Sequence, residues 1–159
     1  MSDFFDNIII KAFTKNKKGY LIINEYVGKS RLQYSGSQIS AINTAIKKIP
    51  KSFRQIYKTN IFKNRYYGSG VLRMIIADPS ECVDSESILP EIHKRFETII
   101  EKPYGGNLLM SALKDIAHHF IDLSDEKSKV LQHLFDLEDE YLKSHQSDFV
   151  FGIYEFKND

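Results

Sequence analysis

Tryptophan is absent from this 159-residue chain, and cysteine occurs once, at Cys82. A single cysteine excludes an internal disulfide and any zinc or iron–sulfur site that needs several thiolates. No apolar run approaches the roughly 20 residues that a membrane-spanning helix needs. The N-terminus does not resemble a signal peptide, because Asp3 and Asp6 stand where basic residues would be expected. These absences predict a cytoplasmic protein without a membrane partner.

Catalytic motifs are also missing. Gly68-Ser69-Gly70 precedes a predicted strand instead of opening a helix, so it is not a phosphate loop. No Gly-x-Ser-x-Gly nucleophile turn occurs. His93 or His145 could serve an acid–base site, although neither has an identifiable partner in the sequence. We therefore expect no enzymatic activity and no cofactor.

Histidines and aspartates on two neighbouring predicted helices are candidate metal ligands. They are Asp115, His118, His119, Asp122, His133 and Asp136. Facing helices can bring such side chains together. However, both histidines of the first helix point away from its apolar stripe, which includes Leu113 and Ile116. We expect no metal site.

What the chain does contain is enough apolar material for one core. Its hydrophobic content is 42% and its aromatic content 13%, all Phe and Tyr. Since domains usually have about 100–150 residues, residues 1–159 are predicted to form a single domain.

Apolar periodicity predicts a mixture of helices and strands. The helices are expected over residues 4–13, 36–49, 88–101, 107–123 and from Ser124 to about Tyr141, and the strands over 20–27, 67–78 and 149–156, with 31–34 as a possible hairpin partner. Residues 71–76 are almost continuously apolar, which is typical of a strand buried on both faces. The prediction is an α+β fold: a small sheet with a central buried strand, packed against several helices.

The charges nearly cancel overall, 22 basic against 21 acidic, but they are separated along the chain. Residues 1–67 hold 13 basic and 3 acidic residues (+10), whereas residues 68–159 hold 9 basic and 18 acidic residues (−9). One interpretation is that the two halves attract each other within the fold or merely solvate their own surfaces. The other is a basic face and an acidic face, each steering a partner of opposite charge.

Candidate binding residues follow from the densest charges. The acidic set is Asp125, Glu126, Asp136, Glu138, Asp139 and Glu140, with a smaller group at Asp78, Glu81, Asp84 and Glu86. The basic set is Lys47, Lys48, Lys51, Arg54, Lys58, Lys63 and Arg65, interleaved with Phe53, Tyr57, Phe62, Tyr66 and Tyr67. Cations for phosphates and aromatic rings for stacking are typical of a nucleic-acid surface.

In size and layout, and in the acidic stretches 122–126 and 136–140, the chain resembles the immunity proteins of bacterial contact-dependent growth inhibition and related polymorphic toxin systems. The resemblance is one of general character and rests on no motif. It implies a protein that neutralises a cognate toxin, with a basic nuclease domain as the expected partner, by covering the active site or substrate surface of the toxin. The alternative is a nucleic-acid-binding or regulatory domain that uses residues 47–67. A third possibility is an enzyme whose site residues are scattered along the chain.

Overall fold

The structure is a computed structural model that describes residues 1–14, 19–122 and 124–157. It contains helices and a three-stranded sheet, which confirms the α+β class. The residues group into two compact units. Unit 1 comprises Met1–Gln33, Ser69–Tyr104 and Ser147–Asp159, and unit 2 comprises Tyr34–Gly68 and Gly105–Gln146. Each unit joins segments that are distant in the sequence, and the expectation of one domain over 1–159 stays a prediction.

The sheet belongs to unit 1. Its strands are β1 (Tyr20–Tyr26), β2 (Phe96–Gly105) and β3 (Phe149–Phe156), in the order β1-β3-β2. β1 pairs antiparallel with β3, from Tyr20 opposite Glu155 to Tyr26 opposite Phe149. The strands predicted at 20–27 and 149–156 are therefore confirmed, and the central strand of the sheet is β3.

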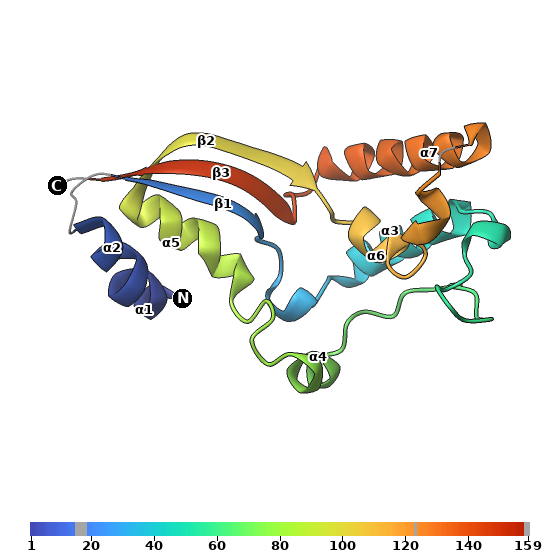
Figure 1. Cartoon of the computed structure of the whole chain (residues 1–159), viewed down its shortest axis with the longest axis horizontal. Coiled ribbons are helices and arrows are strands. Elements are labelled where there is room, and N and C mark those ends of the chain that lie inside the picture. The colour runs from blue at the N-terminus through green and yellow to red at the C-terminus, as the bar shows by residue number, and fades with distance from the viewer. Residues whose placement is uncertain (15–18, 123, 158–159) are drawn as a thin grey trace. The chain divides into compact units, whose positions relative to one another are not determined.

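The N-terminal helical segment and one later helix cover one face of this sheet (Figure 1). The N-terminal helical segment comprises α1 (Ser2–Phe4), a π-helical turn η1 (Phe5–Ile9) and α2 (Ile10–Thr14); the other helix is α5 (Ile88–Arg95), which follows the 3₁₀ turn η4 (Ser85–Ser87). The core between helices and sheet is centred on four buried side chains: Phe5, Ile92, Phe96 and Tyr154.

The apolar run at 71–76 is a helix, α4 (Val71–Ala77), and the prediction of a buried strand there is wrong. Six of its seven residues are exposed, including the large apolar Val71, Leu72, Ile75 and Ile76, and only Met74 is buried. The helix satisfies its own backbone, since Met74 N–H donates to Gly70 O at 3.0 Å and Asp78 N–H to Met74 O at 2.9 Å. A short apolar run has no period that distinguishes strand from helix.

Two further predictions in unit 1 are wrong. The helix expected over 88–101 ends at Arg95, and the chain continues as β2 from Phe96. β-branched Thr98, Ile99 and Ile100 favour the strand. The hairpin partner expected at 31–34 is instead the 3₁₀ turn η2 (Ser30–Leu32).

Unit 2 is helical. Its elements are α3 (Gly36–Lys48), the 3₁₀ turn η3 (Lys51–Phe53), α6 (Leu109–Leu113), the 3₁₀ turn η5 (Ala117–Phe120) and α7 (Asp125–Leu142). α3, α6 and α7 pack against one another around Ile42, Ile46 and Leu134, none of which has measurable exposure (Figure 1). The Ser35 hydroxyl caps α3 by accepting from Gln38 N–H, and the Ser124 hydroxyl caps α7, as that residue type predicts.

The helix predicted over 107–123 is interrupted. α6 ends at Leu113, and Asp115 has a φ of +67°, a left-handed conformation that a continuous helix cannot contain. Within the described ranges, no helix is long and apolar enough to cross a membrane.

Opposite responses are expected at two isoleucines. Ile92 is fully buried, so Ile92→Asp places an unpaired charge in the core of unit 1 and is expected to abolish soluble folding, because such burial costs several kcal/mol. Ile76 is 84% exposed, so Ile76→Asp is expected to change the free energy of unfolding by about 0.5 kcal/mol. Soluble yield and urea unfolding are measured for both variants. Loss of soluble folding in Ile76→Asp would indicate that α4 is packed in a core.

Candidate binding surfaces

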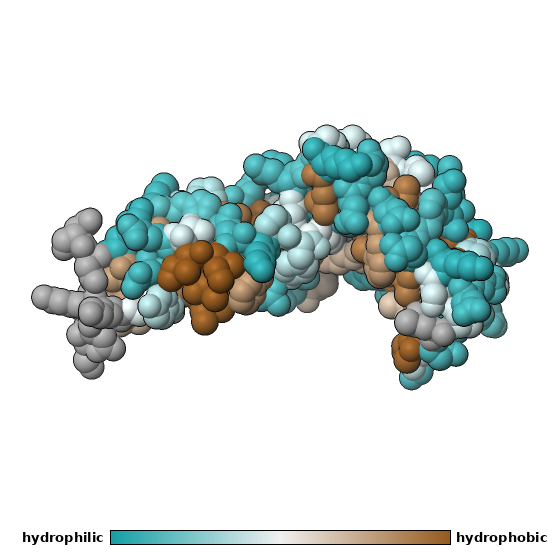
Figure 2. All heavy atoms as spheres, turned by 90° about the horizontal axis from the view of Figure 1, so that it is seen from above, coloured by the Kyte–Doolittle hydropathy of each residue, from teal (hydrophilic) through white to brown (hydrophobic). Residues whose placement is uncertain are grey.

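α7 carries the acidic candidate residues, and its helical period divides them between two faces. At about 100° per residue, Asp125, Asp136, Asp139 and Glu140 lie on one side, with Glu126 at its border. All five are exposed, and we call them the acidic face of α7. In Figure 2, which views the molecule from above, hydrophilic atoms predominate over the helix.

Glu138 points the other way, and its assignment to a partner-binding surface is wrong. It lies four residues after Leu134 on the packed side of α7 and is only 4% exposed. Its carboxylate accepts three backbone hydrogen bonds, from Asn107 N–H at 2.8 Å and from Leu108 and Leu109 N–H at 2.9 Å. These are the otherwise unpaired donors at the start of α6. Glu138 therefore fastens α7 to α6.

Glu138→Gln is expected to lower the free energy of unfolding by about 2–3 kcal/mol. An amide in this position sets an N–H group against backbone donors, and hydrogen bonds to a charged acceptor typically contribute about 1.5–3 kcal/mol. The matched control is Asp139→Asn at the neighbouring exposed position, expected to stay within about 0.5 kcal/mol of wild type. Urea denaturation followed by circular dichroism compares them; equal stabilities would mean that Glu138 is dispensable.

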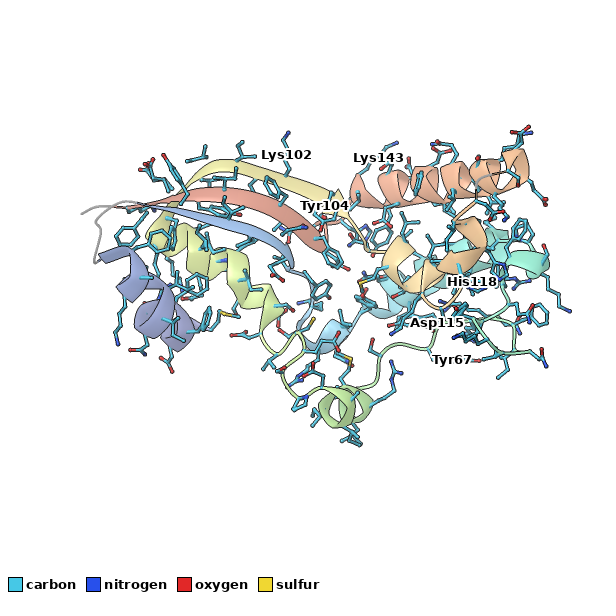
Figure 3. The ribbon with its side chains drawn as sticks, viewed as in Figure 1. Tyr67, Lys102, Tyr104, Asp115, His118 and Lys143 are labelled. Atoms are coloured by element: carbon cyan, nitrogen blue, oxygen red, sulfur yellow. The ribbon has the colours of Figure 1, made fainter. Side chains whose placement is uncertain are left out.

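The acidic face of α7 also bears an apolar side chain. Phe135 is 43% exposed and lies four residues before Asp139, on the same side of the helix. Two carboxylates of the face have local partners: Asp136 accepts from Gln132 Nε2 at 2.9 Å, and Glu140 pairs with Lys143, which is labelled in Figure 3. Such exposed pairs are weak, so a binding partner can replace them.

The basic candidate set loses Lys63 in the same way as the acidic set loses Glu138. Lys63 is 9% exposed, and its Nζ donates to Ser111 O and to Lys114 O, both at 2.6 Å. Burial lowers the pKa of Lys63 to about 8, against an opposing attraction from Asp115. The expectation that Lys63 contributes to a basic surface is therefore wrong.

Lys63 is expected to make stability rise with pH. Its pKa is about 8 in the folded state and 10.5 in a solvated lysine, so between these values the unfolded state holds more protons than the folded state. The free energy of unfolding therefore increases as the pH rises through that window. Urea unfolding at several pH values should show the gap between wild type and Lys63→Met moving in favour of wild type. Exposed Lys51→Met should show no such trend, and an unchanging gap for Lys63→Met would contradict the shift.

The other basic candidates lie at or near the surface. Lys47, Lys48, Lys51, Lys58 and Arg65 are exposed; Arg54 is half-buried and donates to Asn64 Oδ1 at 3.5 Å. Of the interleaved rings, Tyr57 is 57% exposed and Tyr67, labelled in Figure 3, is 81% exposed. Each has a cation over its ring, Lys58 at 5.1 Å from the Tyr57 centroid and Arg65 at 5.3 Å from the Tyr67 centroid.

The remaining aromatic rings of this segment pack against other side chains of the protein. Phe53 packs edge-on against Phe120, with centroids 5.8 Å apart. Phe62 lies under Lys51 and Tyr66 beside Tyr34. Only Tyr57 and Tyr67 are therefore available as open stacking surfaces among the predicted aromatic residues, all of which lie in the described part of the chain.

The basic and acidic halves of the sequence do not correspond to the two units of the structure. Unit 2 contains both the basic segment 34–68, which has no acidic residue, and the acidic α7. Unit 2 has 11 basic and 8 acidic residues, and unit 1 has 11 basic and 13 acidic residues. Among the described residues, no ion pair within 4 Å joins 34–68 to α7. Direct pairing between the basic segment and α7 therefore does not account for their opposite charges.

The smaller acidic group lies in unit 1 and is largely engaged. Asp84 pairs with the N-terminal amine at 3.0 Å and Glu86 with Lys29 at 2.9 Å, while Arg31 donates to two carbonyl oxygens of this loop. Hydrogen bonds from Ser80 hold the pKa of Asp78 below its usual value. Burial raises the pKa of the nearby Cys82 thiol, which disfavours a reactive thiolate.

His93 has a partner that the sequence did not reveal. Its Nε2 lies 2.7 Å from Glu101 Oε2, and the buried Tyr154 hydroxyl donates to the same oxygen at 2.6 Å. Burial and this carboxylate raise the pKa of Tyr154; burial alone would raise the pKa of Glu101, but its hydrogen bonds from Tyr154 and His93 lower it. Had residues 88–101 formed one helix, Glu101 would lie two turns beyond His93. The β-branched residues after Arg95 are the sequence signal that indicates a strand at this position.

The histidines weighed as metal ligands have other contacts. The His118 ring stands 4.0 Å from that of His119 and 5.0 Å from that of Tyr57, and His119 Nε2 lies 2.9 Å from Gln55 O. Burial, with a smaller effect from His119, lowers the pKa of His118. Across the ranges that the structure describes, no group of three His, Cys, Asp or Glu side chains is placed to hold a metal ion.

No protein-family model, no curated protein and no solved structure matches this chain.

Proposed function

We propose that this chain is an immunity protein: it binds and neutralises a cognate bacterial toxin, with the acidic face of α7 docking on a basic surface of that toxin. The observation that carries the proposal is the exposed Phe135 at the edge of five exposed carboxylates on one helix. Protein interfaces commonly combine an aromatic anchor with a charged surround.

The charges suit a nuclease as the toxin. A nuclease active site is built to receive phosphates, and the carboxylates of the acidic face outnumber the exposed Lys129 on the same side of the helix, so they offer such a site net negative charge. Asp136 and Glu140 lie one helical turn apart, and Asp125 is aligned with Asp136 three turns away. Complementary charge of this kind raises the rate of association and suppresses wrong partners. An inhibitor needs no catalytic group of its own, in line with the absence of catalytic motifs from the sequence.

The identity of the partner is tested by capture and rescue. The wild-type chain is used as bait in extracts of the cells that encode it, and a captured protein is expressed alone and together with the chain. The proposal requires that the captured protein arrests growth alone and that co-expression restores growth. Capture of nucleic acid without any growth-arresting protein would overturn it.

The double variant Asp136→Lys/Asp139→Lys is expected to slow association with the captured toxin at least about tenfold at low salt and to weaken its salt dependence, because the long-range attraction is reversed. Folding should stay nearly intact, since exposed helix positions tolerate such changes within about 0.5 kcal/mol each. Association is measured by stopped-flow at several salt concentrations. Phe135→Ala is expected to act on dissociation instead, because it removes a short-range contact.

The matched control is Glu97→Lys/Glu155→Lys, which makes the same change in net charge at two exposed strand positions of unit 1. If the control slows association as much as the α7 variant does, net charge and not the acidic face of α7 governs binding.

A further inference from the structure

A polar hollow of about 330 Å³ lies within unit 2, between α3 and the segment that follows η3. Its wall on the α3 side includes Ser40, Asn43, Thr44 and Lys47, and its other wall includes Asn64 and Arg65. Among the described residues, no acidic side chain lines it. The Asn43 amide and the Thr44 hydroxyl already donate to backbone carbonyl oxygens. The cations Lys47 and Arg65, with the Ser40 hydroxyl and the Asn64 amide, supply the donors that an anion requires.

The two walls are fixed relative to each other. The Asn43 side chain, 9% exposed, accepts from Tyr66 N–H at 2.7 Å and donates to Tyr66 O at 3.0 Å. This two-way bond holds residues 64–67 against α3. Arg54 donates to Asn64 Oδ1 and so leaves the Asn64 amide nitrogen as its donor. The hollow is therefore formed before any ligand arrives, which lowers the entropic cost of binding.

Tyr67 does not line the hollow, but its ring contacts Arg65, which does. Its ring is 81% exposed, and the Arg65 guanidinium that lines the hollow lies 5.3 Å from the ring centroid. A ligand whose anionic group occupies the hollow can therefore place a flat ring on Tyr67. Nucleobases attached to phosphates have this combination of groups, and bases stack on exposed aromatic side chains.

We propose that this hollow binds the phosphate of a nucleoside phosphate, held by Lys47 and Arg65, with the attached base stacked on Tyr67. The phosphate has two possible sources, a free nucleotide or one link of a single-stranded nucleic acid. The proposal does not rest on the immunity function, since none of these residues belongs to the acidic face of α7.

The probes are a fluorescent ten-nucleotide oligo(dT) and oligo(U), followed by anisotropy, and ADP and inorganic pyrophosphate, followed by calorimetry. Lys47→Glu and Arg65→Gln are expected to weaken binding about tenfold or more. For the oligonucleotides, each variant should also reduce the slope of log affinity against log salt by about 0.7. Tyr67→Ala should weaken the base-containing probes at least about fivefold and leave pyrophosphate unchanged.

The chain supplies matched controls. Lys48 is exposed and adjacent to Lys47 but does not line the hollow, so Lys48→Glu makes the same charge change outside it. Tyr57 is exposed beside Lys58 as Tyr67 is beside Arg65, so Tyr57→Ala removes an equivalent ring elsewhere. Both controls are expected to change affinity less than twofold, and thermal melting checks that each variant is folded.

The different probes distinguish a free nucleotide from a nucleic-acid strand as the source of the phosphate. Saturable ADP binding that the oligonucleotides do not exceed identifies a free nucleotide, and tighter oligonucleotide binding with a salt slope identifies a strand. Equal losses in Lys47→Glu and Lys48→Glu, or pyrophosphate binding as tight as ADP binding, would overturn the site as proposed. So would the failure of every probe to bind at low salt. Asp136→Lys/Asp139→Lys should leave nucleotide binding intact, so this proposal and the immunity proposal can fail separately.

Discussion

Unit 2 depends on one short helix whose two ends are each held by a buried charge. α6 has only five residues, too few to be stable alone. The Glu138 carboxylate accepts the amide hydrogens at its start, and the Lys63 ammonium donates to carbonyls at its end. Each charge has the sign that the helix dipole favours at that end. Gly105 permits the approach, since a Cβ there would stand 2.8 Å from Glu138 Oε1.

From the sequence, Glu138 and Lys63 are both expected on the surface, and only Glu138 carries a sequence signal to the contrary. Glu138 follows Leu134 by four residues and precedes Tyr141 by three, so helical period alone predicts that it lies on the packed side of α7. The dense acidic stretch at 136–140 nevertheless suggests a surface position for Glu138, and that suggestion is misleading. Lys63 gave no such signal, because it lies outside any helix or strand and its acceptors are 48 and 51 residues away.

The well-predicted elements have a clear period or cap, and the failures do not. α3 and α7 begin at serine caps, and β1 and β3 alternate between the faces of the sheet. Helix α4 was mistaken for a central strand because its apolar run lacks a period. In the actual central strand, β3, Gly152 is essential: a Cβ there would stand 2.3 Å from the Tyr154 ring. That ring lies over Gly152 and its hydroxyl donates to Glu101, contacts that no local pattern in the sequence encodes.

Glu138 and Lys63 are buried inside unit 2. The other charges of segment 34–68 and α7 lie at or near its surface, where a partner can reach them. Segment 34–68 then offers cations and two open tyrosine rings, and α7 offers carboxylates and Phe135, with no ion pair within 4 Å between these described segments. The near-neutral whole protein has little long-range field. However, charges are screened over only about 8–10 Å at physiological salt, so an approaching molecule senses the face in front of it and not the net charge. The two proposed partners, a basic toxin and a nucleoside phosphate, therefore require no separation of charge between the two units.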